Sequence, residues 1–230
     1  MDLASGAPCG AEALLRWVHP ERGVVAPSQF VPVLEESGLI VPVGEWVLRQ
    51  ACEDLKRWSG GARPRLPVAV NLSARQFRQH DLDRRIMAVV GAAGVDPALI
   101  ELEITESHVM HDPAHATAVM RALREAGLRI ALDDFGTGYS SLAYLTRFPL
   151  AAVKVDRSFV AEVLHDEADA TIVRAIVHMA KTLGFTVVAE GVESQAQAQF
   201  LHRLGCQQAQ GFFFARPMPQ DALAEYLGRF

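Results

Sequence analysis

The chain has 230 residues, of which 50% are hydrophobic and 21% are charged, with 17 glycines, 12 prolines and 3 cysteines. This composition excludes a disordered chain, a collagen-like repeat and a disulfide-stapled scaffold. The net charge is −5 and the sequence has no dense run of Lys or Arg, which excludes the usual electrostatic footprint of a DNA- or RNA-binding protein.

The amino-terminal residues MDLASGAPCG have neither the basic start nor the apolar run of a signal peptide. No apolar stretch approaches the ~18 residues that a membrane span needs. The three cysteines, Cys9, Cys52 and Cys206, match no metal or redox spacing. We therefore expect a reduced, cytoplasmic domain with no direct membrane insertion, although an intact parent protein could be membrane-anchored.

Short β-rich segments alternate with amphipathic helical segments along the whole chain. The predicted strands are 10–17, 66–72, 100–105, 129–134, 151–156, 185–190 and 208–213. The predicted helices are 28–37, 45–58, 81–93, 114–126, 168–183, 195–204 and 220–227. Repeated strand–helix units predict a mostly parallel sheet, so we expect one α/β domain over residues 1–230, a TIM-like (β/α)8 barrel with one strand missing from the count. A doubly wound open sheet is the alternative.

Alternation along the predicted strands separates two faces. In AAVKVD, Val153 and Val155 share one face and Lys154 lies on the other, and in IELEIT the acidic Glu101 and Glu103 lie opposite the apolar residues. If the apolar faces pack against helices, the polar faces must line the barrel interior. A polar group then lies at or near the carboxyl end of every strand, where barrel enzymes keep their active sites: Arg16 with Glu12 deeper, Asn71, Glu103, Asp133, Lys154, Glu190 and Gln210.

Several inward carboxylates cannot be neutralised by the single lysine Lys154, and buried charges cost several kcal/mol unless they are paired or bound to metal. Carboxylate and amide oxygens favour hard cations such as Mg²⁺, Mn²⁺ or Ca²⁺. The adjacent acids Asp133 and Asp134 could share two ions and clamp a phosphodiester, whereas paired carboxylates without metal would suit glycoside hydrolysis. The amide and the lysine among the acids favour metal-assisted phosphoryl chemistry.

Seven separated motifs occur in order along the chain. They are AEALLR at 11–16, NLS at 71–73, EITE at 103–106, DDFGTG at 133–138, KVD at 154–156, AEGVE at 189–193 and QG at 210–211. With these motifs the chain, from about Asp2 to Phe230, closely resembles the EAL-domain phosphodiesterases that hydrolyse cyclic di-GMP. The resemblance implies metal-dependent hydrolysis of one phosphodiester to give linear pGpG.

The resemblance also implies a role for each matching residue. Glu12, Asn71, Glu103 and Asp133 would hold one Mg²⁺ or Mn²⁺ ion, and Asp133 would bridge to a second ion held by Asp134 and Glu190; we expect Ca²⁺ to inhibit. Lys154 would orient the attacking water, and whether Glu190 is a general base or only a ligand stays open. Leu14, Arg16, Asp156 and Gln210 would contact substrate. Glu106 and Glu193 match supporting acids, and the Gly136–Gly138 turn would act as a hinge for the loop after Asp134.

Family members usually begin with one more strand, which this chain lacks, so we expect an EAL domain that is truncated at its amino terminus. An uncovered sheet edge favours pairing with another chain, and we expect a homodimer, fused to or paired with a sensor or cyclase domain. A catalytically silent EAL domain that binds cyclic di-GMP or a protein partner is the alternative function. Such members typically lose a metal ligand, and none is lost here.

Overall fold

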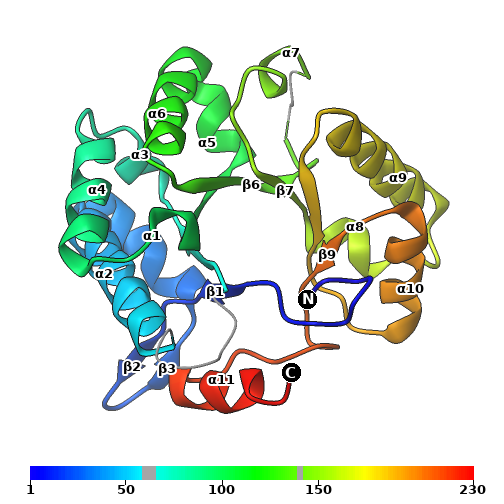
Figure 1. The fold of residues 1–230 in the computed structure, drawn as a ribbon, viewed down its shortest axis with the longest axis horizontal. Coiled ribbons are helices and arrows are strands. Elements are labelled where there is room, and N and C mark those ends of the chain that lie inside the picture. The colour runs from blue at the N-terminus through cyan, green and yellow to red at the C-terminus, as the bar shows by residue number, and fades with distance from the viewer. Residues whose placement is uncertain (59–65, 139–141) are drawn as a thin grey trace.

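The computed structural model describes residues 1–58, 66–138 and 142–230. Seven parallel strands form one curled sheet, and a separate two-stranded antiparallel hairpin lies beside it (Figure 1). The sheet strands, in spatial order, are β1 (Ala11–Ala13), β4 (Val68–Asn71), β5 (Ile100–Thr105), β6 (Arg129–Phe135), β7 (Ala152–Val155), β8 (Thr186–Ala189) and β9 (Gln208–Ala209). Their sequence order equals their spatial order, as expected for successive strand–helix units. The predicted TIM-like architecture is therefore confirmed.

Helices surround the outer face of this sheet (Figure 1). The long helices are α1 (Pro27–Ser37), α2 (Ile40–Trp58), α4 (Leu82–Ala93), α6 (Pro113–Glu125), α9 (Glu167–Thr182), α10 (Gln195–Leu204) and α11 (Gln220–Leu227). The shorter ones are α3 (Ala74–Phe77), the 3-10 helix η1 (Pro97–Leu99), α5 (Glu106–His111), α7 (Leu142–Leu145) and α8 (Arg157–Ala161). Among the described residues, no helix is long and apolar enough to cross a membrane.

The core lies between the sheet and the helices. The outward residues of β5, Ile100, Leu102 and Ile104, are fully buried, as are Val153 and Val155 of β7. Burying such aliphatic side chains stabilises the fold by roughly 1.5–3 kcal/mol each. Because apolar residues take the outward positions, the intervening Glu103 and Lys154 are left facing the interior, as the alternation predicted.

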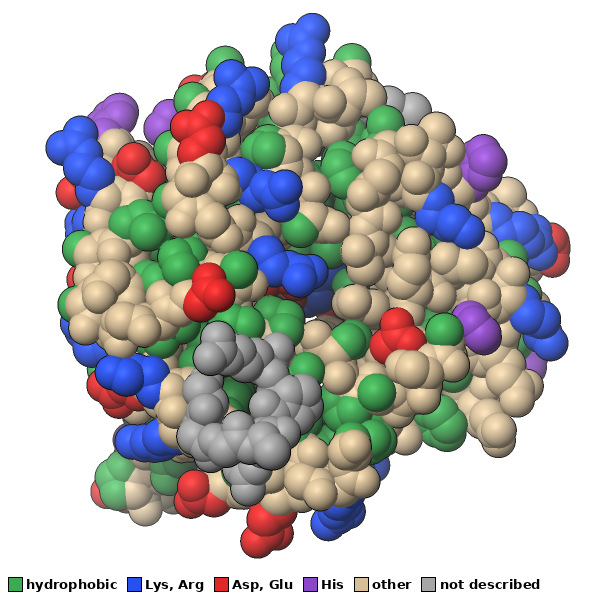
Figure 2. Space-filling view, viewed as in Figure 1, with side chains coloured by type: hydrophobic (Ala, Val, Ile, Leu, Met, Phe, Trp, Pro, Cys, Tyr) green, Lys and Arg blue, Asp and Glu red, His purple; other side chains and the backbone are tan. Residues whose placement is uncertain are grey.

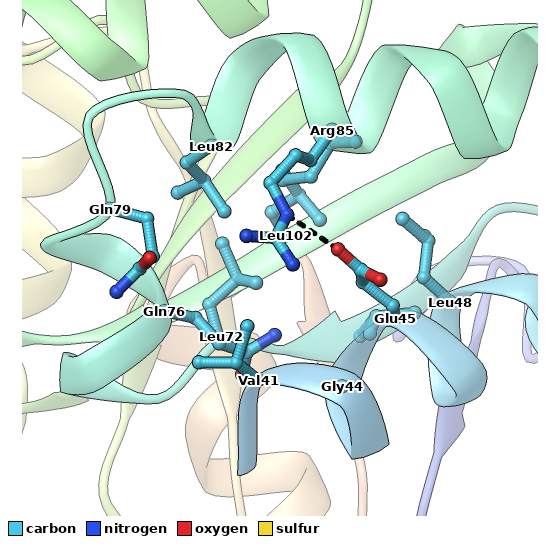
Figure 3. Close-up of a pocket in the computed structure, with 12 residues that line it drawn as sticks. Val41, Gly44, Glu45, Leu48, Leu72, Gln76, Gln79, Leu82, Arg85 and Leu102 are labelled. Carbon is cyan, nitrogen blue, oxygen red and sulfur yellow. Dashed lines mark hydrogen bonds and ion pairs between the residues drawn. The ribbon is translucent and has the colours of Figure 1, made fainter. Parts of the chain in front are cut away.

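Helices α2 and α4 pack side by side over β4 and β5, and a polar contact bridges them (Figure 3). Arg85 Nε donates to Glu45 Oε1 at 2.6 Å, beside the apolar side chains of Leu48 and Leu82. Both charged side chains are about one-third exposed, so the pair contributes little beyond fixing how the helices meet.

The sheet does not close on itself through β1 and β9. Instead, the amino-terminal residues run antiparallel along the free edge of β9, between β9 and β1 (Figure 1). The Met1 amino group donates to the Ala209 carbonyl oxygen at 2.8 Å, the Ala209 amide donates to the Met1 carbonyl at 2.9 Å, and the Leu3 amide donates to Gln207. Met1 to Leu3 thus supply a short edge segment where the sequence predicted only a missing strand.

Two predicted strands are too long. The segment 10–17 was expected as one strand, but β1 ends at Ala13, and Trp17 begins the hairpin of β2 (Trp17–His19) and β3 (Gly23–Val25). The segment 208–213 ends after Ala209, because Gly211 lies against the Val192 backbone and the chain turns there. A Cβ at Gly211 would lie only 2.2 Å from the Val192 carbonyl oxygen.

Helix α2 begins at Ile40, five residues before the predicted start. Pro42 and Gly44 discouraged a helix at this point in the sequence. Pro42 is tolerated because it lies in the first turn, where its missing N–H has no helical partner. Gly44 packs closely against Gln76, since a Cβ there would lie 2.0 Å from Gln76 Nε2. The other long helices match their predicted bounds within one residue, and the five short helices were not predicted.

Candidate active site

Lys154 is the centre of a carboxylate cluster at the carboxyl ends of the sheet strands. Its Nζ lies 2.7 Å from Glu103 Oε1, 2.7 Å from Glu190 Oε1, 3.4 Å from Asp133 Oδ1 and 3.7 Å from Glu12 Oε2. The Lys154 side chain is only 3% exposed. Five different strands, or the residues just after them, therefore deliver one ammonium and four carboxylates to one point.

Two amides join this cluster from its sides. Asn71 Nδ2 donates to Glu12 Oε1 at 2.8 Å, and Gln210 Nε2 donates both to Glu12 Oε2 at 3.1 Å and to Glu190 Oε1 at 2.8 Å. Asn71 lies at the end of β4, directly opposite Glu103 in the ladder with β5. The amides hold Glu12 and Glu190 in fixed orientations across the gap between β1 and β9.

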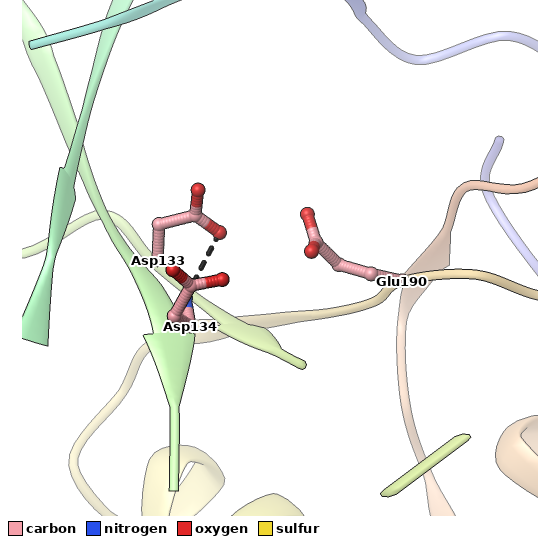
Figure 4. Close-up of side chains that lie close together, drawn as sticks. All are labelled: Asp133, Asp134 and Glu190. Atoms are coloured by element: carbon pink, nitrogen blue, oxygen red, sulfur yellow. Dashed lines mark hydrogen bonds between the residues drawn. The ribbon is translucent and has the colours of Figure 1, made fainter. Parts of the chain in front are cut away.

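Asp133 and Asp134 both face the cluster although they are consecutive residues of β6 (Figure 4). Consecutive strand residues normally point to opposite faces. The ladder between β6 and β7 is irregular here, because Leu132 pairs with Val153 but Phe135 pairs with Val155, so two aspartates oppose the single Lys154. This bulge, with Asp134 at φ 54°, turns the second carboxylate toward Glu190.

Burial sets the protonation of this cluster. It raises the pKa of Glu103 well above its usual value, and attraction to Lys154 only partly offsets this effect. Burial likewise raises the pKa of Glu190, to about 7, and that of Asp134, where the neighbouring Asp133 adds repulsion. For Lys154, burial lowers the pKa, but the surrounding carboxylates outweigh burial and keep it above its usual value, so this ammonium stays charged.

The cluster fits divalent cations. Oxygens of Asp133, Asp134 and Glu190 lie within 4.8 Å of one another, and the buried Glu103 Oε2 has no hydrogen-bond partner among the described residues. Leaving a buried carboxylate oxygen unpaired costs free energy, which a cation at that oxygen would recover. Carboxylate and amide oxygens are also the donor set that Mg²⁺ and Mn²⁺ prefer.

Glu106 supports the turn that follows the two aspartates. Its side chain is 1% exposed, and its Oε2 accepts a hydrogen bond of 3.0 Å from the Gly136 amide. Gly136 has φ 100°, and a Cβ at Gly138 would lie 3.0 Å from Glu106 Oε1. Gly136 and Gly138 therefore allow the backbone of the turn to pack directly against the Glu106 carboxylate. The supporting role of Glu106 and the hinge motion of the turn both stay predictions.

A cleft of about 610 Å³ opens beside the cluster. Glu12, Glu190 and Gln210 of the cluster are among its lining residues. The walls come from residues near the amino terminus, from α8 and from the segment between β9 and α11. This volume lies within the range of small-molecule sites. The molecule is also hollowed near its middle, where basic and acidic side chains surround the opening in the view of Figure 2.

The predicted substrate contacts have different positions. Leu14 lines the cleft, and Gln210 joins the cluster; Glu193, which was predicted as a supporting acid, also lines the cleft. Arg16 is exposed, and its Nη1 donates to the Leu15 carbonyl oxygen rather than to a residue of the cluster. Asp156 caps α8 by accepting from the Ser158 amide at 3.0 Å.

Sequence reasoning missed most of the side chains that line the cleft, among them Arg157, Phe212 and Arg216. Arg157 directly follows the KVD motif, and the other two follow the QG motif within a few residues. Proximity to those motifs was the available signal. The strand predicted over 208–213 hid this signal, because it ran through the actual turn at Gly211. Strand alternation would have put Phe212 and Gln210 on one face of a continuous strand.

Together the fold and the cluster define a TIM-type barrel with a candidate metal centre at the carboxyl ends of its strands. The family model of the EAL domain matches residues 1–217. The chain belongs to the EAL domain family.

MucR of Pseudomonas aeruginosa, a relative named as a bifunctional diguanylate cyclase/cyclic di-GMP phosphodiesterase, is 46% identical over 219 residues, covering 95% of this chain and 32% of the relative. The solved PaMucR phosphodiesterase in complex with c-di-GMP has a TM-score of 0.91 at 46% identity, covering 94% of this chain and 87% of that chain. A manganese/cy-diGMP complex of Klebsiella pneumoniae BlrP1 has a TM-score of 0.82 at 30% identity, covering 96% and 54%. The chain spans about a third of the length of the curated relatives it matches.

Proposed function

We propose that this chain is a metal-dependent phosphodiesterase that hydrolyses cyclic di-GMP to linear pGpG. The observation that carries the proposal is the convergence of Glu12, Asn71, Glu103, Asp133 and Glu190 around Lys154, with no member of the set replaced. The phosphodiesterase name of MucR and its complex with c-di-GMP support the choice of substrate.

Two divalent cations, Mg²⁺ or Mn²⁺, would occupy the cluster. Glu12, Asn71, Glu103 and Asp133 would hold one ion, and Asp133 would bridge to a second held by Asp134 and Glu190, a division that the grouping of these last three acids supports. When bound, such ions supply an activated water and neutralise charge on the phosphodiester. The manganese complex of BlrP1 supports this choice of ion.

The protein side chains supply orientation and charge. Lys154 would donate hydrogen bonds to the attacking water, because its Nζ is already held between Glu103 and Glu190 and stays protonated. Glu190 would either receive a proton at its carboxylate or serve only as a ligand. Leu14, Arg16, Asp156 and Gln210 would contact the dinucleotide, and Glu193 and the Gly136–Gly138 turn would support the site.

The test is hydrolysis of cyclic di-GMP by purified protein with Mg²⁺ or Mn²⁺, followed by chromatographic separation of pGpG, with EDTA as the control. Glu103→Gln should reduce turnover at least about a hundredfold, since it replaces an anionic metal ligand by a neutral amide, a larger change than the loss of a supporting partner. Glu101→Gln is the matched control, because Glu101 lies two residues earlier on β5 and pairs with Arg129 instead. Equal turnover of the two variants would overturn the proposed site, and binding without turnover would indicate a receptor.

Further parts of the proposal concern assembly and regulation. We expect Ca²⁺ to replace the active cations and inhibit, which the same assay measures. A homodimer, and fusion to or pairing with a sensor or cyclase domain, are proposed from the family membership and from the multidomain length of relatives such as MucR. Light scattering tests the dimer. The cytoplasmic location stays a prediction.

A further inference from the structure

One buried glutamine side chain links α8 to α10. Gln197 lies in the first turn of α10 and is only 8% exposed. Its Oε1 accepts hydrogen bonds from the Glu193 and Ser194 amides, both at 2.9 Å. Its Nε2 donates to the Val160 and Ala161 carbonyl oxygens of α8, both at 3.1 Å. Both the oxygen and the nitrogen of this buried amide therefore have partners.

These contacts satisfy backbone groups at two helix ends. The first amides and the last carbonyls of an α-helix have no partner within the helix. Val160 and Ala161 are the last two residues of α8, and Gln197 supplies a donor to both. At α10, Ser194 and Gln197 form a capping box, in which the Gln197 amide donates to Ser194 Oγ at 3.2 Å. One side chain therefore caps the end of α8 and the beginning of α10 together.

The loop between β8 and α10 lies directly against the segment that joins β7 to α8. The Glu190 amide donates to the Val155 carbonyl oxygen at 3.1 Å. Gly191, at φ 67°, approaches α8 so closely that a Cβ there would lie 2.6 Å from the Arg157 Cβ. The hydrogen bonds from Gln197 to the last carbonyls of α8 hold the far end of this contact. The loop is therefore attached to its neighbour along its whole length.

The two segments that Gln197 joins begin at two members of the carboxylate cluster. Lys154 lies on β7 before α8, Glu190 directly follows β8, and Lys154 Nζ lies 2.7 Å from Glu190 Oε1. We propose that Gln197 is a positioning residue that holds Glu190 and Lys154 in register, an inference that rests on the proposed metal-dependent hydrolysis. Gln197 acts through the backbone, because its side chain hydrogen-bonds only backbone groups and the Ser194 hydroxyl among the described residues.

Two substitutions separate the two halves of this contact. Gln197→Met keeps the length of the side chain and removes all of its hydrogen bonds. Gln197→Glu keeps the acceptor, and a glutamate at this position still completes a capping box, so α10 keeps its start even if Gln197→Met fails to fold. An ionised carboxylate has no hydrogen to donate to the α8 carbonyls. Gln207→Met is the matched control, because Gln207 Oε1 accepts from the Val187 amide at 2.9 Å near the amino end of β8.

The experiment measures three quantities at pH 8 for each variant: the calorimetric Kd of Mn²⁺ without substrate, kcat and KM for cyclic di-GMP at saturating Mn²⁺, and the unfolding midpoint. Gln197→Met and Gln197→Glu should each raise the Kd of Mn²⁺ about tenfold and lower kcat about tenfold, because a displaced Glu190 misplaces a metal ligand relative to Lys154. KM should change less than kcat. Gln207→Met should change neither the Kd of Mn²⁺ nor kcat.

The outcomes separate the positioning role from a merely structural one. Lower unfolding midpoints for both Gln197 variants, with wild-type Kd and kcat, would show that Gln197 only stabilises the fold and would overturn the inference while leaving the reaction intact. A loss in Gln197→Met alone would assign the effect to the α10 cap and would overturn the link to α8.

The Mn²⁺ measurement also separates this inference from the proposed function. A wild-type protein that binds Mn²⁺ without hydrolysing cyclic di-GMP, with weaker Mn²⁺ binding in both Gln197 variants, would support the positioning role and overturn the proposed reaction. A wild-type protein that binds no Mn²⁺ would overturn the positioning role together with the proposed metal centre.

Discussion

Replacing Lys154 by methionine tests whether the ammonium holds the metal-free site together. Methionine preserves most of the side-chain volume and removes only the charge, while Glu103, Glu190, Asp133 and Glu12 stay in place around it. Removing one partner of a buried ion pair costs about 3–5 kcal/mol, because an uncompensated charge is left behind.

The cost should depend on pH in a way that follows from the carboxylates. Without Lys154, one more carboxyl group of the cluster must bind a proton for the cluster to remain buried. With an unfolded-state pKa near 4.3, holding that proton costs about 5 kcal/mol at pH 8 but only about 1 kcal/mol at pH 5. The variant can leave a buried charge unpaired or hold an extra proton, and the smaller of these two costs sets its loss of stability. Lys154→Met should therefore be destabilised by about 3–5 kcal/mol at pH 8 and by about 1 kcal/mol at pH 5.

The assay is thermal and urea unfolding in EDTA at both pH values. An unfolding entropy of about 2.1 cal/mol/K per residue converts 3–5 kcal/mol into a midpoint roughly 6–10 °C lower at pH 8. Lys181→Met is the matched control, because Lys181 is exposed on α9 and forms no ion pair within the described residues. An equal loss at pH 5 and pH 8, or no loss at either, would refute the electrostatic account.

Three further predictions concern single residues. Burial raises the pKa of Glu190 from 4.5 to about 7, so the folded state loses stability as the pH rises through this range. Glu190→Gln should remove that loss and stabilise the metal-free protein by up to about 3 kcal/mol at pH 8, with no gain at pH 4. Urea unfolding in EDTA at the two pH values measures this difference. Burial raises the pKa of the Cys52 thiol to about 11 and that of Cys206 to about 12. Iodoacetamide at pH 8 should therefore modify only the partly exposed Cys9 in the native protein, as measured by mass spectrometry. Labelling of Cys206 before Cys9 would contradict this. The metal-free Asp134→Gly variant should be about 1 kcal/mol more stable than the Asp134→Ala variant. Both variants lose the carboxylate, but only glycine adopts φ 54° without strain. The reverse order in urea unfolding would show that the backbone at the bulge is not strained.

The inward direction of the catalytic groups was predictable because it follows from a local rule. Ile100, Leu102 and Ile104 require one face of β5 to be buried, and this fixes Glu103 on the other face. The same rule places Lys154 in the interior. Because neighbouring strands are parallel, their carboxyl ends lie at the same end of the barrel. The composition of the cluster could therefore be predicted from the sequence alone.

The simultaneous placement of Asp133 and Asp134 could not be predicted in the same way. Strand alternation assigns them to opposite faces, and the bulge that reconciles them is a property of the pairing between β6 and β7. The pairing of Met1 with Ala209 is likewise a contact between distant residues. Nothing local in the sequence specifies either contact.

The charges of the site explain why one lysine and cations are both needed. Five carboxylates, those of Glu12, Glu103, Asp133, Asp134 and Glu190, surround the single ammonium of Lys154, which leaves four formal negative charges when all are ionised. Without cations, the raised pKa values of Glu103, Asp134 and Glu190 reduce this excess by retaining protons. Two divalent cations would balance it fully. Cation binding must then displace protons but need not displace the ammonium, so Lys154 can serve the fold when the site is metal-free and remain in place to orient a water when the cations are bound.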